Sequence, residues 1–450
     1  MYAIAILQRL PRWLHPLVAV AIALMAMCWL FSFSSSFFFA SGGRPAGGCD
    51  FTMRYNEIRC VLDRIDPFAI TRGDIAHPVY VRFNRWAPGR MNLTGYTPWA
   101  YVFLLPFALL PKALAAAAYT LLELGCVLFL FRFAYRHAKR TGLSEEGAVA
   151  VSASLCLLVY PITSAFGAGN FGIPFAATIA LMADCLDSGN EACAGLCWAF
   201  LMCKPQIGVL FTVPIFLHRK WKTLGVAAGV CLAATLVVAA WLGVSPVKLL
   251  LEVVRDGDVG TYATDLLPLA LFRAIVPHVS KGVVLLLHAV IGFFLCLFCC
   301  WRVRTIRDWA VRLAPPAFFC TVWTYGWPHD KCVYALVVAV AMTYCFEANS
   351  TKSLRIVTLA LSILCGASII GAFLPAGSIH PMFILTTRKL FAWGPDSGHF
   401  RQVGILEILL SLCSIAKTIL AVILLATLLP NRAHRCSLSD EATLPLPRHV

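Results

Sequence analysis

The sequence contains few charged residues, and acidic residues are the scarcer kind. Only 13% of its 450 residues are charged, and 22 Asp and Glu stand against 37 Lys and Arg. Hydrophobic residues make up 60% of the chain, and its mean hydropathy is +0.79. A water-soluble core does not need so apolar a composition, so a soluble protein is excluded and a polytopic membrane protein is predicted. The chain also has no repeat of a fixed short period and no low-complexity tract.

The start of the chain lacks the pattern of a cleaved signal peptide. Its first apolar run, residues 14–39, is long and has no small-residue cleavage site, so we expect it to remain as the first spanning helix. Other runs long enough to cross about 30 Å of hydrocarbon as helices are residues 113–133, 224–242, 283–300, 356–374 and 405–429. We predict one all-α transmembrane domain of about twelve helices over residues 1–430. A polar, disordered tail is expected over residues 431–450.

The net charge of +15 does not indicate a nucleic-acid partner, because the basic residues form short clusters beside the apolar runs. The larger clusters lie at residues 132–140, 219–222, 302–312, 352–355 and 432–435. Placing them in the cytoplasm gives an alternating topology with both termini inside. Cys193 and Cys197 share a helix face, but no His or second Cys pair completes a metal-ligand spacing. Neither a metal nor another cofactor is expected.

The long segment 42–95 falls on the external side in this topology. Between Arg44 and Arg90 it holds eight Arg and five acidic residues, an excess that the positive-inside rule does not favour. An anionic lipid phosphate would explain the arginines, which could instead pair with the segment's own acids or with lipid head groups. Apolar residues at helical spacing predict an amphipathic helix over 51–64 that holds Asp50 at its start. Cys49 and Cys60 could form a disulfide, unless this helix keeps them apart.

Four irregular regions are expected on that same side, and the first is the segment around Asp50. The second is Gly169-Asn170, a flexible turn near a ligand or an ordinary tight loop. The third is Lys204-Pro205, where a proline breaks an apolar run beside a lysine that either meets an anion or snorkels to the surface. The fourth, residues 325–331, suits sugar and phosphate, or an interfacial belt with a His329-Asp330 pair. Their convergence predicts a polar site at the membrane edge.

In this order, these regions resemble the integral-membrane glycosyltransferases with the GT-C fold, and in particular glycosyltransferase family 87, the polyprenyl-phosphate-mannose-dependent mannosyltransferases. The residues that carry the resemblance are Asp50-Phe51, Tyr55, Ile65-Asp66-Pro67-Phe68, Tyr96-Thr97-Pro98, Leu109-Leu110-Pro111, Gly169-Asn170, Lys204-Pro205 and Trp327-Pro328-His329. Thr97 stands where the family often has Pro, and Phe68 where it has Tyr. The chain also lacks a second acidic residue beside Asp50, which argues against a metal-assisted mechanism.

The resemblance implies a GT-C-like helical bundle and an inverting transfer of a sugar, mannose in the first place, from a polyprenyl-phosphate donor to a lipid-linked or glycan acceptor. Asp50 would be the general base. The donor phosphate would be bound by Lys204, His329, Lys331 and Arg54. Substrate contacts would come from Tyr55, Tyr96, Asn170, Gln206, Trp327 and Asp330. Donor, acceptor and membrane lipids would be the partners, in a bacterial inner membrane with the site facing the periplasm.

Two other functions use a similar set of residues. A transporter or flippase of lipid-linked sugars would place polar residues at mid-membrane and show related halves, whereas here they lie at one face without evident symmetry. A polymerase or ligase of envelope polysaccharide would use the same kind of donor. Glu123 and Lys417 stand inside long apolar runs, where we expect them to pair with each other or with backbone groups, outside the site.

Overall fold

The computed structural model describes residues 49–72, 74, 96–260, 281–322 and 328–347, with separate positions at 355, 358, 360–362, 365 and 419. Within these residues the regular structure is helical, and no strand is found. The all-α prediction is therefore confirmed for this part of the chain. The expected spans 14–39 and 405–429 and the tail 431–450 lie outside it, apart from single positions.

The helices follow one another closely, and most are joined by turns of a few residues. In chain order they are α3 Cys49–Leu62, α4 Pro67–Arg72, α6 Pro98–Ala108, α7 Lys112–Arg140, α8 Glu145–Ala153, η2 Ser154–Leu158, α9 Val159–Ala168, α10 Gly172–Asp187, α11 Glu191–Leu201, α12 Pro205–Gly208, η3 Val209–Phe211, α13 Thr212–Leu217, α14 Trp221–Leu242, α15 Pro246–Gly260, α17 Lys281–Val303, α18 Trp309–Val322, η5 Pro328–Val333 and α19 Tyr334–Phe346.

Two of the described helices, α7 and α14, are long and apolar enough to cross a membrane. A third span results if α8 with η2 and the helix that follows, bent by 56°, are counted as one. Large apolar side chains such as Leu121, Leu128 and Val237 are exposed on α7 and α14, as expected of surfaces that face lipid. These helices indicate a membrane protein, but the predicted number of about twelve spans is not confirmed.

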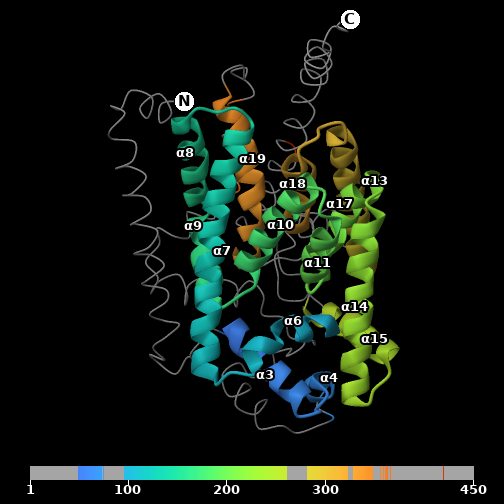
Figure 1. Ribbon diagram of the computed structural model, residues 1–450. Helices are drawn as coiled ribbons and strands as arrows, with labels where there is room; N and C mark the ends of the chain where they lie inside the picture. Colours follow the sequence, from blue (N-terminus) through green and yellow to red (C-terminus); the bar gives the residue numbers. More distant parts are fainter. Residues whose placement is uncertain are drawn as a thin grey trace, which may run out of the picture.

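Helices α7 and α14 run along opposite sides of the molecule, with α10 and α11 between them (Figure 1). Helices α3, α4 and α6 lie across one end, the lower end in the figure. There the 3-10 helix η5 packs against α9 and α10. Buried side chains form one large core that extends from Phe51 of α3 to Tyr344 of α19. We call the end that carries α3 and α6 the site end.

The opposite end, which we call the basic end, is the one where α7 finishes and α14 begins. Its loops are joined by ion pairs: Arg140 NH2 lies 2.6 Å from Asp184 Oδ1, and Lys220 Nζ lies 2.9 Å from Glu191 Oε1. The backbone N–H of Trp309 also donates to Asp187, at 3.0 Å. The basic clusters 132–140, 219–222 and 302–312 therefore meet on one side, as the topology requires.

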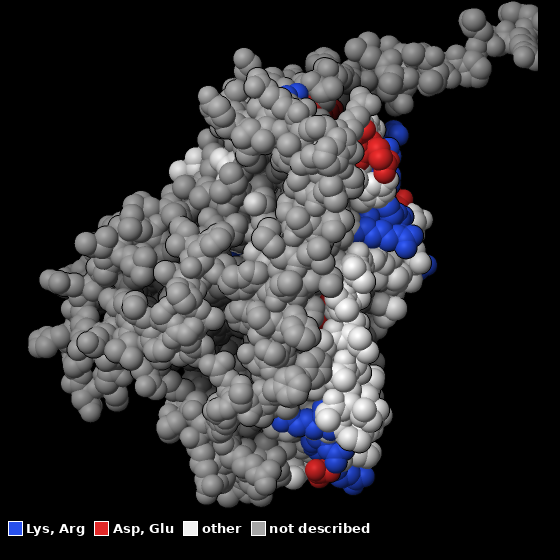
Figure 2. Space-filling model, turned by 90° about the vertical axis from the view of Figure 1, so that its left-hand side faces the viewer, with Lys and Arg blue, Asp and Glu red and all other residues white. Residues whose placement is uncertain are grey.

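The distribution of charge fits a protein set across a membrane. Figure 2 shows one side of the molecule, where the charged side chains of the described surface gather toward its two ends and leave a mostly uncharged stretch between them. Such a band suits the hydrocarbon, in which unpaired charges are costly. A polar site at either end would then lie at the edge of lipid.

Candidate active site

Asp50 lies in the first turn of α3, where unpaired backbone N–H groups favour a carboxylate. The helix is held by its buried residues Phe51 and Ile58. Its more exposed face is tied to the turn between α6 and α7, because the Tyr55 hydroxyl donates to the Leu110 carbonyl at 2.8 Å. The predicted helix 51–64 is thus confirmed with bounds shifted toward the N-terminus, and most of its apolar face packs into the bundle.

Asn170 reaches Asp50 from a point 120 residues further along the chain. Its Nδ2 donates to Asp50 Oδ2 at 2.6 Å, while its Oδ1 accepts the backbone N–H of Gly172 at 2.9 Å. The second bond fixes which side of the amide is the donor, since only Oδ1 can accept from a backbone N–H. Asn170 is buried, so the carboxylate is held from a rigid support.

The turn before Asn170 depends on a glycine. Helix α9 ends at Gly169, whose φ of 62° is left-handed and suits a residue without Cβ. The Gly169 N–H then bonds the Phe166 carbonyl and the Asn170 N–H the Ala165 carbonyl. The turn expected from the sequence is found as a tight turn that ends α9, and it positions Asn170 for Asp50.

The segment Tyr96-Thr97 is attached to the break between α11 and α12. Thr97 donates its backbone N–H to the Cys203 carbonyl at 3.3 Å, and its hydroxyl lies 3.4 Å from the same oxygen. A proline at position 97 could donate neither bond, so this departure from the family pattern adds a link between two parts of the site. It joins the segment that carries Tyr96 to the one that carries Lys204.

Lys204 and Asp330 form a buried ion pair. Lys204 Nζ lies 2.5 Å from Asp330 Oδ1, and the exposed fractions of the two side chains are 7% and 1%. Lys204 begins α12 directly before Pro205, at the predicted interruption of the apolar run, and Asp330 belongs to η5. The lysine therefore does not snorkel to the surface but meets an anion inside the protein.

Arg54 lies one turn along α3 from Asp50, and it is buried. Its NH1 group is 2.6 Å from Glu57 Oε2 on the same helix. The guanidinium also covers the Tyr96 ring, with Cζ 4.7 Å from the ring centroid. The arginine thus pairs with an acid of its own segment, which was one of the two alternatives for these residues.

Tyr96 shows that these groups share one electrostatic environment. Burial raises the pKa of its phenol well above the usual value; the Arg54 cation opposes that rise, and the carboxylates of Asp330 and Asp50 add to it. The phenol is therefore neutral at physiological pH and able to donate a hydrogen bond. Two of the four regions singled out in the sequence, the segment of Asp50 and the one of Asp330, supply the charges around this ring.

The other predicted site residues are placed less closely. Tyr55 has its hydroxyl on a backbone carbonyl, and Gln206 lies partly buried in α12. Lys331 is partly buried in η5 and has an interaction partner. His329 belongs to η5, but its side chain lies outside the described residues, as does all of Trp327.

The disulfide considered between Cys49 and Cys60 is not formed. Both residues belong to α3, and Cys60 is a free, buried thiol. Eleven residues of helix separate them by about 16 Å along the axis, far beyond the ~7 Å that a disulfide permits between Cα atoms. Burial, with smaller contributions from Glu57 and Asp63, raises the pKa of the Cys60 thiol to about 11, so it is unreactive.

Two residues of α7 were not predicted to belong near the site. The Tyr119 ring stacks on Phe51 with centroids 5.0 Å apart and meets Phe171 at 5.3 Å, and these are the residues that follow Asp50 and Asn170. One turn further along α7 lies Glu123, which has no exposed surface. The sequence marks Glu123 as a carboxyl group inside an apolar run. It does not show that Glu123 lies near Asp50, because the two residues are far apart in the chain.

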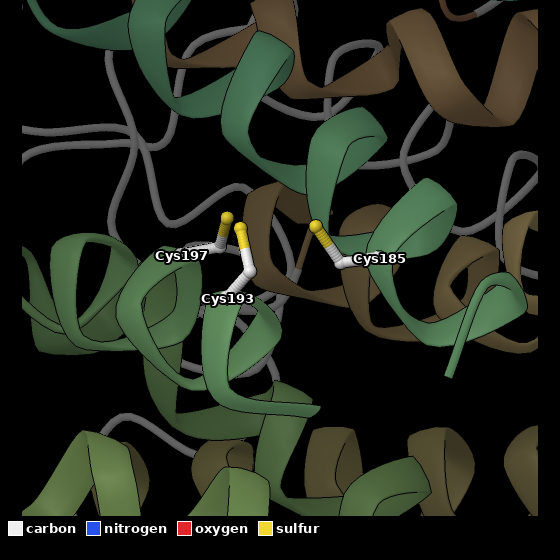
Figure 3. A group of neighbouring side chains, drawn as sticks. All are labelled: Cys185, Cys193 and Cys197. Carbon is white, nitrogen blue, oxygen red and sulfur yellow. The ribbon is translucent and has the colours of Figure 1, made fainter. Parts of the chain in front are cut away.

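A separate cluster of thiols lies near the basic end. The sulfurs of Cys185, Cys193 and Cys197 all lie within 4.8 Å of one another, contributed by α10 and α11 (Figure 3). No metal was expected from the spacing of Cys193 and Cys197, but the packing of α10 against α11 adds Cys185 as a third thiol. Three such sulfurs are a possible ligand set for a thiophilic metal ion, away from Asp50.

The long apolar helices and the buried charged groups at one end indicate a membrane protein with a polar cluster at that end. Comparison with known families identifies it further. The sequence model of glycosyltransferase family 87 matches residues 94–324, just over half of the chain. The protein therefore belongs to glycosyltransferase family 87, and it is a glycosyltransferase.

The match includes Tyr96, Asn170 and Lys204, and it leaves Asp50 and Asp330 outside its bounds. Neither a curated protein nor a solved structure matches the chain. The roles of individual residues therefore rest on their geometry.

Proposed function

We propose that this glycosyltransferase takes its sugar, mannose in the first place, from a polyprenyl-phosphate donor and transfers it with inversion to a lipid-linked or glycan acceptor. The observation that carries the proposal is the bond between Asp50 and Asn170 at the site end, near the buried cations Arg54 of the same helix and Lys204 of a distant segment. A prenyl chain is as apolar as the exposed outer faces of α7 and α14. A donor of this kind could therefore present its phosphate at the site while its chain stays in lipid.

In the proposed reaction Asp50 is the general base. It takes the proton of an acceptor hydroxyl as that oxygen attacks the anomeric carbon. The bond between this carbon and the phosphate oxygen breaks, prenyl phosphate leaves with the electron pair, and the configuration inverts. A carboxylate offers about four lone-pair positions, so accepting one bond from Asn170 leaves capacity for an acceptor hydroxyl. Asn170 acts as a positioning residue.

The leaving phosphate needs positive charge, and the two buried cations are already paired with carboxylates. An ammonium group has three N–H donors and a guanidinium has five, so both Lys204 and Arg54 can serve a carboxylate and a phosphate together. Before the donor binds, the carboxylate partners offset part of the energetic cost of burying the two cations. Lys331 and His329 are proposed to complete the phosphate site from η5, and Tyr55, Gln206, Trp327 and Asp330 to contact the substrates.

We further propose a GT-C-type arrangement in a bacterial inner membrane. The basic end would face the cytoplasm, because short loops rich in Lys and Arg stay on that side. The site end would then face the periplasm. Donor and acceptor would both reach Asp50 from the outer leaflet or from the space beyond it.

A panel of prenyl-phosphate sugars tests the proposal. The purified protein is incubated in mixed micelles with each donor and with a total glycolipid extract, and products are identified by mass spectrometry. We expect consumption of one donor, release of prenyl phosphate and gain of a single hexose by an acceptor. Movement of intact lipid-linked sugar between leaflets without bond cleavage would favour a flippase, and the addition of many units would favour a polymerase.

A further inference from the structure

Glu123 is a carboxyl group in a spanning helix with no hydrogen-bond partner among the residues that the structure describes. Both of its side-chain oxygens are buried and unpartnered, and the residue has an exposed fraction of 0%. Ionisable groups inside a membrane are rare and costly, and those that persist usually serve a binding or transport path. The pairing with Lys417 considered from the sequence involves a residue outside the described part of the chain.

Two further hydroxyls near Glu123 are buried without partners. The Tyr119 hydroxyl, one turn before Glu123 on α7, has none among the described residues, and neither has the Tyr96 hydroxyl. Both rings meet Phe171 edge-on, with centroids 5.3 Å and 5.4 Å away. The phenol of Tyr119 is also within electrostatic reach of Glu123, Tyr96 and Asp50. The three side chains thus form one polar cluster beside the base.

Packing connects this cluster directly to the reacting groups. Tyr119 lies against Phe51 and Phe171, the residues immediately after Asp50 and Asn170. Because α7 runs from the site end to the basic end, Glu123 lies deeper in the bundle than Tyr119. In the proposed function a large acceptor reaches Asp50 from the surface, which leaves the inner side of this residue for the sugar being transferred.

The chemistry of the cluster suits a sugar. A carboxyl group can bind two neighbouring hydroxyls at once, a phenol both donates and accepts, and aromatic faces pack against the C–H faces of a sugar ring. Buried polar atoms that the fold leaves unpartnered are expected at binding sites, where the ligand supplies the missing bonds.

We propose that Glu123 and Tyr119, together with Tyr96, form the subsite that binds the hydroxyls of the transferred sugar and so selects among donors. The inference rests on the proposed function, because it takes a prenyl-phosphate sugar as the donor. It assigns to this cluster the recognition of the sugar, whereas Lys204 and Arg54 are assigned to the phosphate.

The test compares wild-type protein with Glu123→Leu, Tyr119→Phe and the control Thr120→Val. Thr120 lies in the same turn of α7, but its hydroxyl is bonded to the Ala116 carbonyl of its own helix. Each protein is assayed with the accepted prenyl-phosphate sugar, with its singly deoxygenated analogues, and with prenyl phosphate as an inhibitor. These three ligands separate recognition of the hydroxyls from recognition of the phosphate.

For the complete donor we expect Glu123→Leu to lower kcat/KM about 10- to 100-fold and Tyr119→Phe to lower it less. A donor lacking the hydroxyl bound by Glu123 should be used equally well by wild-type and Glu123→Leu. Inhibition by prenyl phosphate should be the same in all four proteins, and Thr120→Val should match wild-type throughout. Thermal unfolding in detergent should show Glu123→Leu to be at least as stable as wild-type, because it removes an unpartnered buried group.

Three results would overturn the assignment. One is unchanged discrimination among deoxygenated donors in Glu123→Leu. Another is a loss of inhibition by prenyl phosphate in Glu123→Leu that equals its loss of kcat/KM, which would show that the variant impairs the whole donor site and not only the recognition of the sugar. The third is a lowered melting temperature that Lys417→Met reproduces, which would make Glu123 half of a structural ion pair. If wild-type protein uses no prenyl-phosphate sugar at all, it is the proposed function that fails, whatever the variants do.

Discussion

Lys204 Nζ lies 2.5 Å from Asp330 Oδ1, and this pair joins two parts of the chain that are 126 residues apart. Both side chains are almost fully buried near the proposed base Asp50. Removing two charges from water is costly, and apolar replacements for such a pair are often as stable. We infer that the pair serves glycosyl transfer and not stability. Mutation of the pair should therefore affect the free energy of unfolding and the rate of transfer differently.

Loss of one partner should destabilise the protein, and loss of both should not. Lys204→Met leaves the buried Asp330 without its lysine, so we expect a cost of about 3–5 kcal/mol in the free energy of unfolding. The double variant Lys204→Met, Asp330→Leu should recover most of it. Thermal unfolding in detergent measures the recovery. Glycosyl transfer by the folded double variant should remain below about 1% of wild-type; near-normal transfer would show that the pair is purely structural.

Replacing Asp50 by Asn should abolish transfer and preserve the fold. The amide cannot take up the acceptor proton, and general-base catalysis contributes about 10²- to 10⁴-fold, so kcat should fall by that factor. Binding of prenyl-phosphate sugar, measured by displacement of a labelled donor, should change little. Asp63→Asn is the matched control, because Asp63 directly follows α3 and is exposed. Transfer at a normal rate by Asp50→Asn would remove the proposed base.

Asn170→Leu should lower turnover without affecting the affinity for the donor. It removes the donor to Asp50 and the acceptor of the Gly172 N–H, so the carboxylate loses its orientation. We expect kcat to fall about 10- to 100-fold with KM nearly constant, as for a group that acts through positioning. Asn170→Ser can keep an acceptor for the Gly172 N–H but is too short to reach Asp50, so it should show a similar loss of turnover.

Asn190→Leu provides the control for this variant. Asn190 also accepts a backbone N–H at the start of a helix, that of Cys193 at 3.1 Å, but it lies at the basic end. Its loss should cost about 1 kcal/mol of stability and leave turnover of the folded protein unchanged. Equal losses of turnover in the two variants would mean that capping alone explains the effect of Asn170.

Much of this arrangement could be predicted from the sequence, for physical reasons that differ between residues. Pro205 beside Lys204 marks a helix break because proline lacks an N–H and lysine is costly in lipid. Gly169 marks a turn because glycine has no Cβ and readily adopts a positive φ. These are local rules, and the structure confirms both. The convergence of the four regions followed from the alternation of basic and neutral loops.

The pairings could not be predicted, because they depend on how helices approach in space. Nothing in the sequence indicates that Lys204 meets Asp330, or that Tyr119 packs between Phe51 and Phe171. The third thiol beside Cys193 and Cys197 depends in the same way on the turn between α10 and α11. Glu123 was recognised as unusual, but only the packing of α7 connects it with Asp50.

Gly208→Ala should disturb the helix that carries Lys204. A Cβ at this position would lie 2.8 Å from the carbonyl carbon and oxygen of Leu201, which are backbone atoms that cannot move aside cheaply. The Gly208 carbonyl also accepts the Trp198 indole N–H at 3.0 Å. We expect a loss of about 1–3 kcal/mol in stability and a marked loss of transfer.

The control for Gly208 is Gly225→Ala on α14, where no atom lies within 4 Å of the new Cβ. Alanine favours a helix over glycine by about 0.5–1 kcal/mol, so this variant should be as stable as wild-type or slightly more so. Unfolding temperature and transfer rate are compared for both. A harmless Gly208→Ala would show that the contact between α12 and the end of α11 relaxes freely.

His218 should make the basic end sensitive to acid. Burial, together with the Arg312 and Lys220 cations, lowers the pKa of this imidazole from 6.5 to about 4. Its ring also packs edge-on against Trp309, with centroids 5.0 Å apart. The unfolded chain therefore binds a proton at this histidine more readily than the folded protein does. By linkage, the stability that the neutral ring provides is complete above pH ~6.5 and decreases as the pH falls toward about 4.

His218→Phe keeps an aromatic ring on Trp309 but cannot take up a proton. We expect its melting temperature in detergent to fall less than that of wild-type between pH 7 and pH ~4.5, while the two agree more closely at pH 7. Carboxylates of the basic end titrate in both proteins, so the difference between the two curves isolates the histidine. Parallel curves would contradict the lowered pKa. Because His218 lies at the end opposite Asp50, the variant should leave the pH profile of sugar transfer unchanged wherever the protein stays folded.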